Sequence, residues 1–148
     1  MLIYLAGPLF SDMEKEFNAK LTAKLEELGF DVFLPQRDGV EKDQALYDKM
    51  SLEERRKGIF DIDQGNVFKA DILLFVLDGR VPDEGAAVEL GIAYAHKVLE
   101  KPEKRLIGLM TDQRAAFPGW KLNPMLSVPL EFIADSEVEL LNYLKKYS

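Results

Sequence analysis

The chain of 148 residues contains no cysteine and a single histidine, His96. Without cysteine, the protein cannot form a disulfide, a thiolate nucleophile or a thiolate-bound metal site. One histidine cannot build a histidine cluster, and a Ser-His-Asp triad on His96 lacks the G-x-S-x-G turn that presents the serine in many hydrolases. The sequence therefore excludes thiol chemistry and offers no supporting motif for a serine hydrolase.

The sequence also lacks long apolar runs and dense basic clusters. No apolar run approaches the roughly 20 residues that a membrane span requires, and no basic stretch precedes an apolar one near Met1. We therefore expect no membrane partner, no signal peptide and a cytoplasmic location. The net charge is −7, and the one basic cluster, residues 55–57, is typical of a solvated helix face. Nucleic acid, which requires clustered lysine and arginine, is not an expected partner.

Glycine-rich phosphate loops are missing as well. Gly7 follows an apolar run, but the chain has neither G-x-G-x-x-G nor G-x-x-x-x-G-K-[ST], so dinucleotide and ATP binding are not expected. Asp61, Asp63 and Asp71 could suggest a magnesium site, but they have helical spacing with apolar residues between them. A solvated helix face suits Asp61 better, and a helix C-terminus suits Asp71 better. The sequence therefore predicts neither a cofactor nor a metal ion.

Segments typical of strands and of helices alternate along the chain. Apolar runs predict buried strands at residues 2–6, 30–34, 72–77, 105–110 and 130–134. Periodicity and cap residues, among them Ser51 with Glu54 and Ser136, predict helices at 13–28, 51–69, 86–95 and 136–147, and residues 36–49 are expected to form a loop. This alternation predicts one α/β domain over residues 1–148, with a flavodoxin-like (doubly wound) five-stranded parallel sheet in the order 2-1-3-4-5 and helices on both faces.

Glu89 is the only charged residue in the apolar run 86–95. A helix that is apolar on nearly every face is expected to be buried in the body of the protein. A carboxylate there must be paired, protonated or used chemically, because leaving it dry and alone is very costly. Tyr4, on the first predicted strand, either packs in the core or donates its hydroxyl to Glu89. Glu89 is thus either part of a structural ion pair or a chemical group.

Further acidic residues cluster where such a sheet binds ligands, at the carboxyl ends of the strands near the switch point between strands 1 and 3. Asp78, Asp83 and Glu84 precede Glu89, and Asp63 belongs to the preceding helix. Two carboxylates in different environments can divide the work of nucleophile and general acid. Alternatively, Asp83 and Glu84 cap the helix that follows them. We expect both roles for Asp83, capping for Glu84 and a strand-end turn at Asp78.

The order and spacing of these segments resemble the nucleoside 2-deoxyribosyltransferases. The matching segments are residues 3–10, 34–36, Asp63 with 70–72, 82–91 and 122–125. The resemblance implies transfer of 2-deoxyribose between purine or pyrimidine bases of 2′-deoxynucleosides by double displacement. Glu89 would attack the anomeric carbon and form a deoxyribosyl ester, which a second base would then resolve. Small-molecule deoxynucleosides and free nucleobases are the implied partners.

The resemblance also implies roles for residues around Glu89. Asp63 would protonate the leaving base and deprotonate the incoming one. Tyr4 would hydrogen-bond to the nucleophile, and Asp83 would hold the sugar hydroxyls and help to orient Glu89.

Other matching residues would bind the substrate. Gln36 stands where the family recognises the base, Phe10 where it stacks an aromatic ring near the base, and Gly7 belongs to the same segment. Asn123 would reach the sugar 5′-hydroxyl in a neighbouring subunit. The resemblance therefore implies a homo-oligomer, built from dimers or present as a tetramer or hexamer, with active sites shared between subunits.

Two alternatives remain open. A related hydrolase cleaves 2′-deoxynucleoside 5′-monophosphates and needs a phosphate cradle, for which only Ser11 is available near strand 1, while Asp83 and Glu84 would repel a phosphate. A non-enzymatic nucleoside-binding domain is the other alternative, since fold does not determine function. Residues 117–120 form an aromatic segment that either covers the base or packs at an interface. Base preference is not determined by the sequence.

Overall fold

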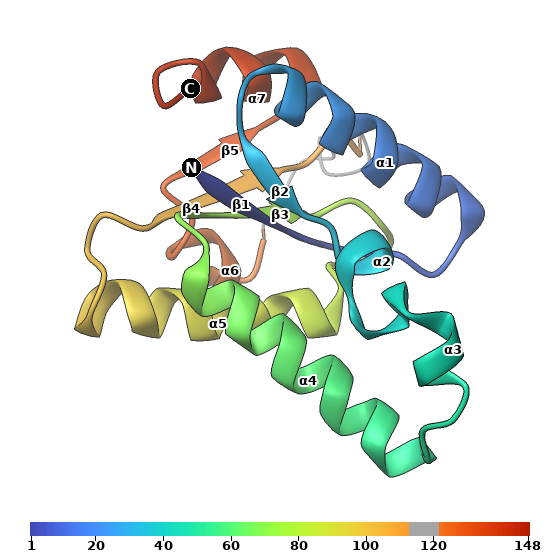
Figure 1. Ribbon diagram of the computed structural model, residues 1–148. Coiled ribbons are helices and arrows are strands. Elements are labelled where there is room, and N and C mark those ends of the chain that lie inside the picture. Colours follow the sequence, from blue (N-terminus) through green and yellow to red (C-terminus); the bar gives the residue numbers. More distant parts are fainter. Residues whose placement is uncertain (113–121) are drawn as a thin grey trace.

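The computed structural model describes residues 1–112 and 122–148. Its strands form a five-stranded parallel sheet in the order β2-β1-β3-β4-β5 (Figure 1). The strands are β1 (Leu2–Ala6), β2 (Asp31–Phe33), β3 (Ile72–Val76), β4 (Arg105–Leu109) and β5 (Phe132–Ala134). The predicted flavodoxin-like sheet and its strand order are confirmed.

Three longer helices lie between consecutive strands, and a fourth follows β5. They are α1 (Asp12–Glu27), α4 (Leu52–Lys69), α5 (Glu84–Leu99) and α7 (Glu137–Leu144). Ser51 and Glu54 form the predicted capping box, and Ser136 caps α7 as expected. None of the helices in residues 1–112 and 122–148 is long and apolar enough to cross a membrane.

The prediction of a loop over residues 36–49 was wrong. That segment contains the short helices α2 (Pro35–Asp38) and α3 (Gln44–Tyr47), with the 3₁₀-helix η1 (Val40–Lys42) between them. Another short helix, α6 (Pro124–Ser127), precedes β5. Each of these elements is about one turn long, so none can show the repeating apolar pattern from which a helix is predicted.

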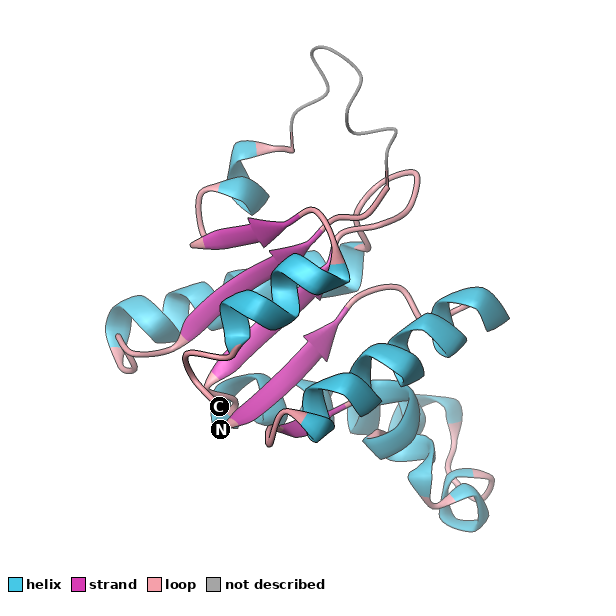
Figure 2. Cartoon of the chain, turned by 90° about the horizontal axis from the view of Figure 1, so that it is seen from above, coloured by secondary structure: helices cyan, strands magenta, loops and turns pink. Residues whose placement is uncertain are grey.

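The helices cover both faces of the sheet (Figures 1 and 2). On one face, Leu21 and Leu25 of α1 pack into the same core cluster as Leu140 and Leu144 of α7. On the other face, α4 and α5 pack through a second cluster that includes Val67, Ala86, Leu90 and Ala93. Every residue of β3 is buried, as expected for a central parallel strand with helices over both faces.

The prediction that the Glu89 helix is buried on nearly every face was wrong for the single chain. α5 contacts the sheet through a narrow row of buried residues, Ala86, Leu90 and Ala93. Val88, Val98 and Leu99 are 60%, 62% and 77% exposed. A helix that lies on a sheet buries only one side against it, so the apolar residues on the other side remain uncovered in one copy of the chain.

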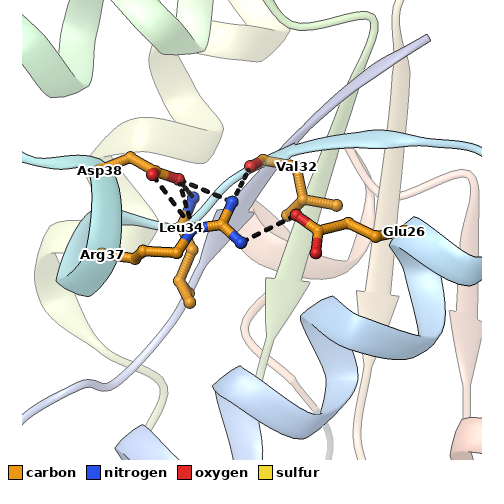
Figure 3. Close-up of polar contacts among 5 residues, drawn as sticks. All are labelled: Glu26, Val32, Leu34, Arg37 and Asp38. Atoms are coloured by element: carbon orange, nitrogen blue, oxygen red, sulfur yellow. Dashed lines mark hydrogen bonds and ion pairs between the residues drawn. The ribbon is translucent and has the colours of Figure 1, made fainter.

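Arg37 protects the outer edge of the sheet at β2 (Figure 3). Its guanidinium donates to the backbone carbonyl of Val32 at 2.7 Å, to Glu26 Oε1 at 2.8 Å and to Asp38 Oδ2 at 2.9 Å. Burial alone would raise the pKa of Asp38, but hydrogen bonds from Arg37 and the Leu34 N–H lower it below its usual value. An edge strand otherwise presents unpaired carbonyls to solvent, so Arg37 both caps the edge and anchors α2.

Arg37→Ala is expected to lower the free energy of unfolding by about 1–2 kcal/mol, because charge-assisted hydrogen bonds are lost and the Val32 carbonyl loses its donor. Urea unfolding measures the change. Lys20→Ala is the control, because Lys20 pairs with Glu16 on an exposed helix face and should leave the unfolding midpoint unchanged. Equal effects of both substitutions would contradict a special role for Arg37.

Candidate active site

Glu89 lies on α5 and faces the end of β1. The Tyr4 hydroxyl donates to Glu89 Oε1 at 2.6 Å, so the hydrogen bond expected from the sequence is present. Tyr4 is fully buried, and its ring stacks on Phe33 with 5.4 Å between the centroids. A short hydrogen bond from a fixed phenol holds the carboxylate in one orientation.

The start of α5 is organised by Asp83. Its Oδ1 accepts from the Ala86 N–H at 2.8 Å, which confirms the predicted capping role. A Cβ atom at Gly85 would lie 3.2 Å from Asp83 Oδ1, so glycine at this position avoids a close contact with the capping carboxylate. Glu84 is exposed in the first turn, where a negative charge suits the helix dipole.

Two carboxyl groups at this site have strongly perturbed pKa values. Burial raises the pKa of Glu89 to about 7, against the lowering effect of the Tyr4 hydrogen bond and with smaller raising effects from Asp63 and Asp83. Burial raises the pKa of Asp63 to about 6. Both groups therefore titrate near neutral pH, where one carboxyl can hold a proton while the other is ionised.

These carboxyl groups line a cavity of about 630 Å³ at the carboxyl ends of β1 and β2. Asp63, Asp83 and Glu89 lie on its wall, together with Gly7, Phe10 and Gln36. A cavity of this size accommodates a small organic molecule. Within residues 1–112 and 122–148, no group of three or more histidine, cysteine or acidic side chains is arranged to hold a metal ion.

Gly7 allows β1 and β3 to approach closely beside the cavity. Its φ is +154°, and a Cβ atom there would lie 2.9 Å from Val76 Cβ. A larger residue would therefore clash with β3 at the point where the two strands diverge. Phe10, 75% exposed, lies in the following loop and contributes to the cavity wall.

Asn123 is not among the residues that line this cavity. It caps α6, accepting from the Met125 N–H at 2.9 Å, and its side chain is exposed. Its expected contact involves a neighbouring subunit and stays a prediction. The aromatic residues 117–120 lie outside the described residues.

The cavity wall also includes residues that the sequence did not single out, among them Lys15, Val40 and Ile59. Ile59 lies one turn before Asp63, so helical spacing could have placed it on the same face. Val40 belongs to η1, inside the segment predicted as a loop, and no sequence pattern indicated that it would lie at the cavity. Lys15 lies on α1, whose periodic face points elsewhere.

Asp78 does more than end a strand. Its carboxylate accepts from the Thr111 N–H at 2.6 Å, the Thr111 hydroxyl at 2.7 Å and the Asp112 N–H at 2.8 Å. These bonds join the segment after β3 to the segment after β4, so Asp78 fixes the start of the connection that leads to α5.

Tyr4→Phe is expected to raise the pKa of Glu89 above about 7, because the Tyr4 hydrogen bond is the contribution that lowers it. A ¹³C NMR titration of the Glu89 carboxyl measures the shift. Tyr94→Phe is the control, since Tyr94 is 43% exposed on the same helix and should leave the titration unchanged. An unchanged or lower pKa in the Tyr4 variant would contradict the orienting role.

Fold and site together define a doubly wound α/β protein with partly buried carboxyl groups at the switch point of its sheet. The family model described as nucleoside 2-deoxyribosyltransferase matches residues 3–142. The chain therefore belongs to the nucleoside 2-deoxyribosyltransferase family.

Solved structures share this fold over nearly the whole chain. A conserved protein from Enterococcus faecalis V583 is 28% identical, with a TM-score of 0.80 and coverage of 100% of this chain and 99% of that one. A 2-deoxyribosyltransferase from Bacillus psychrosaccharolyticus is 24% identical, with a TM-score of 0.76 over 97% and 92% of the chains. The CMP N-glycosidase BcmB of Clostridium botulinum is 22% identical, with a TM-score of 0.59 over 100% of both. A search of curated proteins gave no significant match.

Proposed function

We propose that this protein transfers 2-deoxyribose between the bases of 2′-deoxynucleosides through a covalent deoxyribosyl intermediate on Glu89. The observation that carries the proposal is the Glu89 carboxylate, which lines the cavity, is held by Tyr4 and has a pKa raised to about 7. Membership in the deoxyribosyltransferase family supports the reaction class.

In the first half-reaction, a Glu89 oxygen forms a bond to the anomeric carbon while the N-glycosidic bond breaks. The electron pair of that bond goes to the base nitrogen, and Asp63 supplies the proton. The developing positive charge on the sugar is stabilised by the fixed carboxylate before the ester forms. In the second half-reaction, a nitrogen of the incoming base attacks the same carbon, the ester bond breaks, and Asp63 takes up the proton.

The remaining residues of the site position the substrate in this proposal. Asp83 uses Oδ1 to cap α5, and we assign its Oδ2 to a sugar hydroxyl. Gln36 contacts the edge of the base, Phe10 stacks on its face, and Gly7 lets the sugar approach the backbone after β1.

A nucleotide N-glycosidase is the second candidate, because Lys15 places a cation on the cavity wall that could meet a phosphate. Ser11, however, is not among the residues that line the cavity, and its backbone N–H already donates to Glu14 Oε2 at 2.7 Å. Asp83 and Glu89 add negative charge to the same cavity. These contacts favour an unphosphorylated nucleoside.

The test is incubation with deoxyadenosine, with and without a second base, followed by intact-mass analysis after a 2′-deoxy-2′-fluoro nucleoside is added. We expect base exchange and a covalent adduct on Glu89. Release of base without transfer, or a strict need for a 5′-phosphate, would instead support the glycosidase. Specific binding with neither exchange nor adduct would support a non-enzymatic binding domain.

We also propose that the protein forms a homo-oligomer through the outer surface of α4 and α5. Exposed apolar residues on these helices support this assignment, namely Phe60, Phe68, Val88, Val98 and Leu99. A second copy would cover them and could bring Asn123 to a neighbouring cavity. Light scattering should give a mass above one chain, which Val98→Lys with Leu99→Lys reduces. A monomeric native protein would refute the assignment.

A further inference from the structure

A buried asparagine on α1 makes two hydrogen bonds behind the cavity. Asn18 is 4% exposed, and its Nδ2 donates to the Pro8 carbonyl at 2.9 Å and to Gln36 Oε1 at 3.3 Å. An asparagine amide nitrogen has two hydrogens, so both are used. The orientation of Asn18 is therefore determined, because the flipped amide would place its oxygen against two acceptors.

The side-chain amide of Gln36 contacts one hydrogen-bond acceptor and one hydrogen-bond donor. Its Nε2 donates to the Lys15 carbonyl at 2.9 Å, and its Oε1 accepts from Asn18. If the Gln36 amide rotated by half a turn, oxygen would face the Lys15 carbonyl and nitrogen would face the Asn18 nitrogen. The two contacts thus select one of the two amide orientations.

The backbone that carries Gln36 is fixed from the other side as well. Arg37, the next residue, bonds to Glu26, Val32 and Asp38 (Figure 3). Because α2 is anchored by Arg37, the Gln36 amide cannot adapt to a different base by shifting its backbone. The positions of the donor and the acceptor of this amide are therefore fixed before any ligand binds.

Gln36 lines the cavity, and within the described part of the chain one of its Nε2 hydrogens and one of its Oε1 lone pairs are not used by these two contacts. Together they form a donor next to an acceptor, the pattern by which glutamine reads the edge of adenine in DNA. Adenine presents an amino donor beside the acceptor N1, whereas hypoxanthine presents an oxygen acceptor beside the donor N1–H. Cytosine likewise presents an amino donor beside the acceptor N3, whereas uracil presents an oxygen acceptor beside the donor N3–H. A fixed amide can match only one member of each pair in a given pose.

We propose that Asn18 is a positioning residue that fixes the polarity of Gln36 and so makes the site discriminate between amino and oxo bases of the same shape. The proposal rests on the assignment of this cavity as a nucleobase site. Asn18 does not contact the base in this scheme; it acts through the orientation of Gln36.

The test compares dissociation constants for adenine, hypoxanthine, cytosine and uracil, measured by isothermal titration calorimetry. Binding is chosen because it reports on Gln36 even if sugar transfer fails. The native protein should prefer one member of each amino and oxo pair by about tenfold or more. Asn18→Leu, which keeps the size and removes the donor, should bring that ratio close to one.

Thr22→Val is the matched control. Thr22 is 2% exposed one turn further along α1, and its hydroxyl has no hydrogen-bond partner in the described part of the chain. This substitution should leave the base ratio unchanged. Asn18→Ala, which leaves room for water at the Pro8 carbonyl, serves the same purpose as the leucine variant if that variant does not fold.

Three outcomes would overturn the inference. They are equal affinity of the native protein for both members of each pair, a uniform loss of affinity in the Asn18 variants with the ratio intact, and an equal change of ratio in Thr22→Val. Base discrimination that depends on Asn18, in a protein that transfers no sugar, would uphold the inference and reject the transferase function. Full transfer activity with no dependence on Asn18 would do the reverse.

Discussion

Replacing Glu89 by glutamine is expected to lower base exchange by roughly a thousandfold or more while raising the free energy of unfolding at pH 8. An amide cannot form the deoxyribosyl ester, so transfer through the covalent intermediate stops. Glutamine keeps the shape of the side chain and can still accept from the Tyr4 hydroxyl. The fold should therefore survive the change.

The gain in stability follows from the pKa of Glu89, which burial raises from 4.5 to about 7. Between these values the folded protein holds a proton that the unfolded chain releases. The contribution of this group to stability is thus full below pH 4.5 and is lost as the pH rises through about 7. At pH 8 the native protein carries a buried charge that lowers stability by on the order of 2–3 kcal/mol, and the neutral amide removes that charge.

Urea unfolding at two pH values separates this effect from general repacking. The stability gain of Glu89→Gln should be present at pH 8 and should shrink toward zero near pH 4.5. Glu84→Gln is the control, an exposed acid in the first turn of the same helix, and should keep exchange within about twofold without any gain in stability. A Glu89→Gln variant that loses stability at pH 8 would favour a structural ion pair.

Asp63→Asn is expected to lower kcat/KM for natural deoxynucleosides by about 100-fold to 10,000-fold, because asparagine cannot protonate the leaving base. The loss should be smaller for a nucleoside whose base leaves as a stable anion. Steady-state kinetics with both kinds of donor measure the difference. Asp61→Asn is the control, since Asp61 pairs with Lys57 on the exposed side of the same helix and should stay within about twofold. Equal losses for both donors would contradict the acid role.

The pH dependence of exchange should be bell-shaped, with limbs near the pKa values of about 6 for Asp63 and about 7 for Glu89. In the proposed mechanism the active form has Asp63 protonated and Glu89 ionised, which the two pKa values make the less populated of the two singly protonated forms. Activity falls at lower pH as the pair gains a second proton and at higher pH as it loses both, so the limbs belong to the pair as a whole. Asp63→Asn should remove the alkaline limb. A flat profile from pH 5 to 8 would contradict a shared proton.

Much of the fold could be predicted because its signals are local or periodic. The fully apolar run in β3 indicated a central strand, and Ser51 with Glu54 marked the start of α4 before any tertiary contact was known. The Tyr4–Glu89 bond was predictable because each residue is a lone polar group in an apolar segment, and buried polar groups find partners.

The rest depends on tertiary packing that no short pattern encodes. Among the one-turn helices between residues 35 and 47, α2 is anchored by Arg37, whose partners Glu26 and Val32 come from separate elements. The exposed side of α5 was missed because apolar composition does not reveal which side a sheet covers. Lys15 reaches the cavity wall from α1 only because that helix packs beside α2, and the role of Asp78 depends on two residues after β4.

The order of the sheet has a consequence for how the site comes into being. β1 is made first but lies between β2 and β3, and the hydroxyl of Tyr4 meets a carboxylate 85 positions later in the chain. Pairings between distant segments form slowly, because the entropy cost of closing the long loop between them comes before the contacts stabilise the structure. The cavity therefore cannot form until α5 has been made and has packed against β1, so a shorter fragment would not contain the site.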